Sequence, residues 1–310
     1  MYTGELRWRD FQHKAEKPLR PKNGLGRLLY LEMGREGSKM SNGKSWTNDE
    51  LMIAMNLYCK LPFGQLRHGN PLVIEVAQKM GRTPSSLSMK LCNLAALDPY
   101  HKARGIKGLR STSRADRGIW DEFNSDWERF GMESEEKLQL LLGTTRVEES
   151  DASPVLKRIR KQPTIKMPVS EPAGPTETIM TMKARLGQRF FRQSVLASYN
   201  CRCCITGNPI PELLVASHIL PWGTYPEHRL NPRNGLCLAQ TQDTAFDRGL
   251  ITFDEDYRLV LGPYLRGFLP NEALERNFIA YEGKQIQMPD KFVPDASFML
   301  KHREEVFLHS

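Results

Sequence analysis

Residues 217–250 constrain the fold of this chain more than any other stretch, because they place a base, an amide and two carboxylates close together. The apolar run at 213–216 predicts a strand that delivers His218 to its tip. A loop broken by Pro and Gly follows, and the apolar run at 235–238 predicts a second strand. These runs therefore predict a β-hairpin with a long connecting loop.

Four polar side chains accompany this hairpin. Asn234 directly precedes the second strand, and Asp243 and Asp247 lie in the polar segment after it. Because these aspartates are four residues apart, a helix would project both carboxylates from one face. A helix folded across the hairpin would bring them to His218 and Asn234. A base, an amide and two hard oxygen ligands are the parts needed to hydrolyse a phosphodiester with one divalent metal.

Three short motifs in this region resemble those of a subgroup of the HNH endonucleases. They read A-S-H-I-x-P-W at 216–222, N-G-L-x-L at 234–238 and A-F-D-R-G-L at 245–250. The specificity lies in their combination and order rather than in a single residue. The resemblance runs from about residue 188 to about residue 307, roughly the C-terminal third of the chain.

The resemblance implies a ββα-metal fold with His218 as the general base and Asn234 bracing the hairpin loop. The two metal-ligand positions on the family's helix would be Asp243 and Asp247, and Ser217 is an additional candidate ligand. The chain departs from the eponymous pattern at this helix, because the third letter of H-N-H is not a histidine here.

This departure indicates which cation the site would take. Histidine ligands suit zinc, nickel and cobalt, whereas carboxylates favour hard cations. We therefore expect Mg²⁺ or Mn²⁺ as the cofactor and little activity with zinc. The neighbouring Gln242 should point away from the metal, and Arg229 and Arg248 are secondary candidates for binding a phosphate.

The chain as a whole carries an excess of positive charge that suits a polyanionic partner. Its 310 residues give a formal net charge of +8, and its pI is near 9.2. Charge alone does not distinguish DNA from RNA or anionic lipid. No window approaches the roughly 18 apolar residues of a membrane span, and the N-terminus lacks the pattern of a secretory signal. We expect a cytoplasmic protein without a membrane partner.

Composition divides the chain into four segments and predicts an α+β protein. Residues 1–44 are rich in Arg, Lys and Gly and predict a disordered basic arm, whereas 45–142 show helical periodicity and predict an all-α domain. Residues 143–178 shift to Pro, Ser, Thr and charge, which predicts a flexible linker. Residues 179–310 would then form the nuclease domain.

The all-α domain contains a pair of helices typical of a helix-turn-helix. Helices are expected at 71–80 and 83–97, with Gly81 ending the first. The second would present polar side chains to a major groove of DNA. The candidates are Ser85, Ser86, Ser88 and Lys90, and the basic segment that follows adds Lys107 and Arg110. A structural hairpin in a small helical bundle, followed by a solvated basic loop, is the alternative.

Further helices are expected at 114–130 and 183–199, with a last helical turn or two at 133–142. The first of them carries an apolar stripe, which is typical of a helix that packs on a core.

The cysteine cluster invites a zinc interpretation that the spacing does not favour. Cys201, Cys203 and Cys204 lie together in the sequence, but a structural tetrahedral zinc site usually uses two separated pairs of ligands. Cys237 alone is available to supply the second pair. We interpret these residues as small, semi-buried side chains at the edge of the hairpin.

These observations together predict a metal-dependent endonuclease that cleaves double-stranded DNA, in a restriction or phage-defence role. Two alternatives stay open: a DNA-binding regulator or scaffold with an inactive HNH fold, and an RNA-cleaving member of the same fold. The sequence also leaves open whether the chain forms a homodimer.

Overall fold

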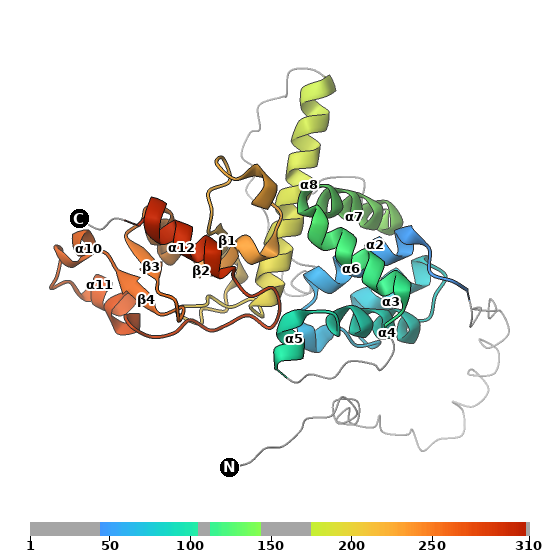
Figure 1. Cartoon of the computed structure of the whole chain (residues 1–310), viewed down its shortest axis with the longest axis horizontal. Coiled ribbons are helices and arrows are strands. Elements are labelled where there is room, and N and C mark those ends of the chain that lie inside the picture. The colour runs from blue at the N-terminus through green and yellow to red at the C-terminus, as the bar shows by residue number, and fades with distance from the viewer. Residues whose placement is uncertain (1–43, 105–111, 144–174, 308–310) are drawn as a thin grey trace, which may run out of the picture.

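The computed structural model describes residues 44–104, 112–143 and 175–307 (Figure 1). The expected basic arm up to residue 43, most of the expected linker, and Lys107 and Arg110 lie outside the described residues. The α+β class is confirmed, because the N-terminal region is helical and small β-hairpins with a helix lie in the C-terminal region. Within the described ranges, no helix is long and apolar enough to cross a membrane.

The N-terminal region is organised around one buried helix. Its described elements are α2 (Asn48–Lys60), η2 (Phe63–Gln65), α3 (Pro71–Lys79), α4 (Pro84–Ala95), α5 (Pro99–Ala103), α6 (Arg114–Ser125) and α7 (Trp127–Leu142). Thr47 begins α2 with a capping box, in which its hydroxyl accepts from the amide of Glu50 and the Glu50 carboxylate accepts from the amide of Thr47. Nearly all of α2 is buried, and α4, α6 and α7 pack against it.

Asp126 divides the helix expected at 114–130 into two. Its backbone leaves the helical region, with φ −150° and ψ 86°, and its side chain accepts a hydrogen bond from the amide of Arg129, which caps α7. The last helical turn expected at 133–142 is instead the second half of α7. The apolar stripe continues across the break, because the rings of Phe123 and Phe130 pack edge to face.

The helix pair expected at 71–97 is present as α3 and α4. Asn70 caps α3, Thr83 caps α4, and Gly81 between them has a φ of +66°, which glycine adopts without steric cost. The pair is thus a helix, a tight turn and a second helix, as the pattern of caps and glycine predicts.

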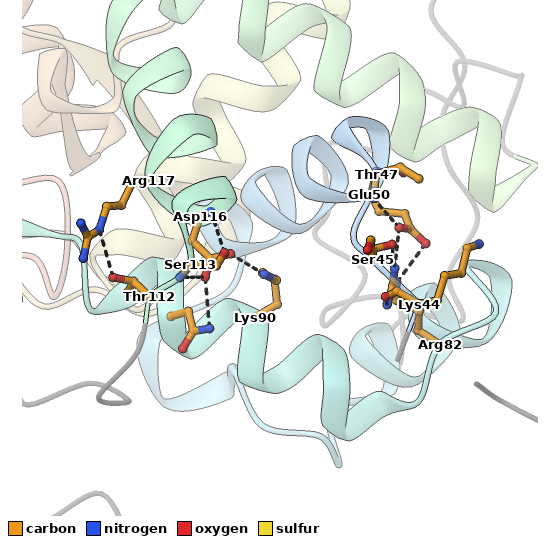
Figure 2. A network of polar contacts seen from close by, with 11 residues as sticks. Lys44, Ser45, Thr47, Glu50, Arg82, Lys90, Thr112, Ser113, Asp116 and Arg117 are labelled. Atoms are coloured by element: carbon orange, nitrogen blue, oxygen red, sulfur yellow. Dashed lines mark hydrogen bonds and ion pairs between the residues drawn. The ribbon is translucent and has the colours of Figure 1, made fainter. Parts of the chain in front are cut away.

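Buried ion pairs attach this helix pair to α2 and α6 (Figure 2). Arg82 Nη2 lies 2.7 Å from the carboxylate of Glu50, and Lys90 pairs with Asp116 in the first turn of α6. The ring of Trp46 lies against both cations, with its centroid 4.0 Å from the Arg82 guanidinium carbon and 4.9 Å from Lys90 Nζ. These contacts fix α4 relative to the buried α2.

The C-terminal region is built on two antiparallel hairpins. The first pairs β1 (Leu214–His218) with β2 (Gly235–Ala239), and α9 (Gln240–Asp247) follows directly and packs on both strands. This is the β-β-α order that the resemblance implied. The other described elements are η3 (Pro211–Leu213), η4 (Pro226–His228), η5 (Pro232–Asn234), β3 (Ile251–Phe253), β4 (Leu259–Leu261), α10 (Pro263–Arg266), α11 (Glu272–Asn277), η6 (Ile279–Tyr281) and α12 (Ala296–Glu305).

The long helix α8 (Pro175–Ser198) lies between the two regions (Figure 1). It begins before the expected 183–199 and packs against α2 and α7 on one side and against β1 and β2 on the other. One cluster of buried side chains extends from Leu51 to Met299. The described parts of the two regions therefore share one core along α8.

Lys291 joins the two regions at a second point. Its side chain is fully buried. Its ammonium donates hydrogen bonds to the carbonyls of Tyr58, Cys59 and Leu61, where α2 ends. The last carbonyls of a helix lack intrahelical donors and carry the negative end of the helix dipole, so a cation is stabilising at this position.

Replacing Lys291 with Met should lower the free energy of unfolding by about 3 kcal/mol, because three buried carbonyls lose their donor at roughly 1 kcal/mol each. Thermal denaturation followed by circular dichroism measures the change. Lys284→Met, which removes an exposed cation, is the matched control. Equal melting temperatures for the two variants would contradict this role for Lys291.

His302 fixes α12 against the hairpins as a neutral imidazole. Its ring stacks on Phe246 of α9, with the ring centroids 3.8 Å apart. Nε2 donates to the carbonyl of Phe246 at 3.2 Å, which leaves Nδ1 to accept from the Thr252 hydroxyl at 3.0 Å. Burial lowers the pKa of His302 to about 4. The residue is thus a structural one, held by two hydrogen bonds and a stack.

The free energy of unfolding should depend on pH because of the lowered pKa of His302. In an unfolded chain its pKa is roughly 6.5. Between pH 6.5 and 4 the unfolded state therefore binds a proton that the folded state does not, and stability present above pH 6.5 is lost as the pH falls. The loss from this group should approach about 3 kcal/mol by pH 4.

Chemical denaturation between pH 7 and pH 4 measures this loss. His302→Gln should be less stable at pH 7 and should lose less stability on acidification, whereas the exposed His68→Gln should follow the wild-type curve. An acid loss in His302→Gln as large as that of the wild type would contradict the assignment.

Candidate functional site

The last two residues of β1 contact different helices. Successive residues of a strand point to opposite faces. Ser217 accordingly lies beside Asp243 of α9, whereas the ring of His218 packs on Phe191 of α8. Asp243 and Asp247 lie one turn apart on α9. The structure thus brings Ser217 and the two aspartates together. His218, the residue after Ser217, is held separately by its packing on α8.

His218 is held in one orientation and one tautomer. Its ring stacks on Phe191 with the centroids 3.9 Å apart and meets the edge of Trp222. Nε2 lies 3.0 Å from the carbonyl oxygen of Arg229. Because a carbonyl only accepts, Nε2 carries the proton and Nδ1 keeps its lone pair. Burial lowers the pKa of His218, and the hydrogen bond to Arg229 acts in the opposite direction. The imidazole is therefore neutral at neutral pH, as a general base must be.

Asn234 ties the two ends of the connecting loop together. Its side chain is fully buried, and its Oδ1 accepts from the amide of Leu220 at 2.8 Å. Its Nδ2 donates to the carbonyls of Leu220 and His228, both at 3.2 Å. An amide is suited to this position because it supplies two donors and an acceptor in one side chain.

Asp243 and Asp247 form a closely spaced carboxylate pair. Burial raises the pKa of Asp243, and the Ser217 hydroxyl acts in the opposite direction. Asp247 is exposed as a residue, yet desolvation of its carboxylate and the charge of Asp243 raise its pKa to about 6. Two like charges at one place oppose each other's ionisation. A divalent cation between them would remove that penalty.

Ser217 adds an oxygen beside this pair. The residue is only 2% exposed, and its hydroxyl has no hydrogen-bond partner of normal geometry among the described residues, although it lies close enough to Asp243 to lower the pKa of that carboxyl. A buried hydroxyl without a partner is costly. Two carboxylates and a hydroxyl are hard oxygen donors, so the residues present fit Mg²⁺ or Mn²⁺.

Soft and nitrogen ligands do not join this site. Gln242 is buried and donates its amide to the carbonyl of Asn277 at 3.1 Å, so its side chain is held away from the carboxylate pair, as expected. In the described part of the chain, no three or more His, Cys, Asp or Glu side chains gather into a group able to hold a metal. The candidate ligands are thus the carboxylate pair with Ser217, and His218 is not among them.

The two arginines expected to bind phosphate have different environments. Arg229 donates through Nε to the carbonyl of Trp222 at 2.8 Å and lies over the Trp222 ring. Arg248, at the C-terminal end of α9, is exposed, and its guanidinium has no hydrogen bond or ion pair within the described residues. Arg248 is therefore the better candidate for contacting a phosphate, and Arg229 is committed to the loop.

The candidates on α4 also separate into two groups. Ser85 is exposed and Ser86 is half-buried, so both remain available. Ser88 donates to the carbonyl of Leu66 at 2.7 Å, and Lys90 is buried against Asp116 (Figure 2). The prediction that Ser88 and Lys90 reach a groove is thus corrected, because both are committed to packing.

Five of the six cysteines are buried thiols, and Cys201 is half-buried. All six are free, and burial raises the pKa values of the Cys204 and Cys237 thiols well above their ordinary range. Metal binding requires thiolates. The interpretation as small buried side chains therefore fits these residues better than a zinc site does.

Phe191 was not identified from the sequence. The helical periodicity around it indicates only a buried face. That this ring stacks on His218 follows from α8 crossing β1, and a pattern local to the helix contains no information about that contact.

Comparison with known proteins agrees with this geometry. A family model described as HNH endonuclease matches residues 203–254, which span both strands of the first hairpin, α9 and β3. Among curated proteins, none matched the chain. Members of this family act on nucleic acid and typically use a divalent metal. The C-terminal part of the chain therefore contains an HNH endonuclease domain, at residues 203–254.

Proposed function

We propose that this protein is a metal-dependent endonuclease that hydrolyses phosphodiester bonds of double-stranded DNA, with Mg²⁺ or Mn²⁺ as its cofactor. The observation that carries the proposal is the environment of His218. A hydrogen bond from Nε2 to a backbone carbonyl leaves Nδ1 free to accept a proton, and Ser217, the residue before it, faces a carboxylate pair.

Each residue of the candidate site would have a separate role in hydrolysis. His218 takes the proton from the attacking water through Nδ1, and the resulting imidazolium keeps its hydrogen bond to Arg229. Asn234 holds the loop that carries this carbonyl. Asp243 and Asp247, with Ser217, would hold the metal, which when bound supplies positive charge to the phosphate and the leaving oxygen. Arg248 is free to contact a phosphate of the substrate.

The proposals about the substrate and the biological role are based on the N-terminal helical region and on the charge of the chain. The pair α3–α4 has the form of a helix-turn-helix, and the net charge of +8 suits a polyanion. A domain that binds double-stranded DNA, joined to a nuclease domain, is the arrangement expected of a restriction or phage-defence enzyme. The two alternatives are an inactive HNH scaffold, which would bind DNA without turnover, and an RNA-cleaving enzyme.

Nicking of supercoiled plasmid tests the site directly. His218→Ala, Asp243→Ala and Asp247→Ala should each lower the rate with Mg²⁺ or Mn²⁺ by about 10² to 10⁴, because each removes a group that acts on the reacting atoms. Zinc should support little activity in the wild type. Asp256→Ala, which removes an exposed carboxylate at the β3–β4 turn, is the control and should cleave at the wild-type rate.

Four kinds of result, from this assay and from parallel DNA-binding and RNA-cleavage measurements, would each reject a different part of the proposal. Near-wild-type nicking by folded His218→Ala excludes it as the base. Full activity in zinc alone, or an unaltered metal requirement in both aspartate variants, excludes the metal site. Binding of DNA without any metal-dependent nicking identifies the inactive scaffold, and cleavage of RNA but not DNA identifies the other alternative.

The proposed reader surface can be tested with a matched pair of variants. Met89 on α4 and Leu140 on α7 are both exposed apolar residues, at 56% and 62%. If α4 enters a groove, Met89→Glu should weaken DNA binding about tenfold through repulsion from phosphates, and Leu140→Glu should have little effect. Fluorescence anisotropy at several salt concentrations measures both. Equal affinities for the two variants would exclude α4 from the interface.

A further inference from the structure

The loop between β1 and β2 lies against α7 and α8, and Leu230 is the side chain of this loop that packs closest to glycines of both helices. This residue is 2% exposed and lies where α7 and α8 come together. A Cβ placed on Gly187 of α8 would lie 2.9 Å from Leu230 Cδ1, and one placed on Gly131 of α7 would lie 3.1 Å from the same methyl. A methyl group at Gly187 would force the Leu230 side chain to shift, and one at Gly131 would press on both Phe190 and Leu230.

The peptide bond before Leu230 carries the acceptor that orients His218. The Arg229 carbonyl, which belongs to that peptide, accepts the hydrogen bond from Nε2 at 3.0 Å. One residue earlier, the carbonyl of His228 accepts from Asn234. The segment 228–230 is therefore held by the buried amide on one side and by the two helices on the other.

Helix α8 contacts the histidine ring as well as the side chain that supports its acceptor. Phe191, which stacks on His218, follows Gly187 by four residues and so lies on the same face of α8. A change in the position of this face would alter the stack and the Leu230 contact together.

We propose that Leu230, seated between Gly131 and Gly187, is a positioning residue through which α7 and α8 hold the Arg229 carbonyl against His218 and keep the Nε2–H tautomer. The inference rests on the proposed function, since it takes His218 as the base. It assigns a part in catalysis to α7, a helix of the region outside the HNH endonuclease domain. Leu230 itself touches no reacting group.

The decisive variant is Gly187→Ala, compared with Gly118→Ala. Gly118 lies in α6, and a Cβ there meets nothing within 4 Å, so the control adds the same methyl to a helix without a clash. We expect Gly187→Ala to lower kcat about tenfold or more with little change in KM, because small displacements of a catalytic group are costly. The ¹⁵N resonances of His218 should show a mixture of tautomers, whereas Gly118→Ala should match the wild type in both measurements.

Rescue distinguishes positioning from general damage. Leu230→Ala alone should also lower kcat and mix the tautomers. The double variant Gly187→Ala/Leu230→Ala should be more active than the product of the two single losses predicts, since the added methyl occupies part of the vacated volume. If Gly187→Ala does not fold, Leu230→Val, the smaller change, should show the tautomer mixture.

The inference is overturned if folded Gly187→Ala keeps the wild-type kcat and tautomer, if the double variant is only multiplicatively impaired, or if Leu230→Val leaves the tautomer unchanged. These failures differ from failure of the proposed function. Cleavage by His218→Ala would reject the base, and the ¹⁵N comparison of Gly187→Ala with Gly118→Ala would still decide whether α8, acting through Leu230, sets the tautomer.

Discussion

The hydrogen bond from His218 Nε2 to the carbonyl of Arg229 is the interaction on which the site depends. It determines which nitrogen of the ring is free, and it links a side chain of β1 to a loop that ends sixteen residues later at Asn234. The other contacts of the loop support this bond. Asn234 holds His228, Leu230 packs between two helices, and the Phe191 ring fixes the plane of the imidazole.

Helix α8 explains how one core can join the N-terminal helical region to the HNH endonuclease domain. One side of it packs on α2 and α7, and the other carries Phe191 against His218. Lys291 adds a second link, since this residue of the C-terminal region satisfies the carbonyls at the end of α2. A fragment that starts near residue 179 would leave part of this shared core uncovered, so the boundaries at 45–142 and 179–310 describe composition better than they describe independent packing units.

The sequence could indicate a candidate chemistry because chemistry depends on residue type and spacing. His218, Asn234, Asp243 and Asp247 could be chosen from their order along a strand, a loop and a helix. Partnerships across the fold were not accessible in this way. Lys90 has the appearance of a groove-facing cation on a helix, but its partner, Asp116, lies 26 residues later in the chain, in the first turn of α6. Leu230 and Phe191 likewise appear as ordinary apolar residues until α7 and α8 are placed beside them.

The most direct test of this account is the position of a bound metal. Crystals grown with Mn²⁺ and measured by anomalous scattering should show one peak at roughly 2.1 Å from a carboxylate oxygen of Asp243 and of Asp247, the distance expected for a small divalent cation and oxygen ligands. His218 should remain bonded to Arg229 and should not be a ligand. A peak coordinated by His218 Nδ1, or by the cysteines in place of the two aspartates, would contradict the account.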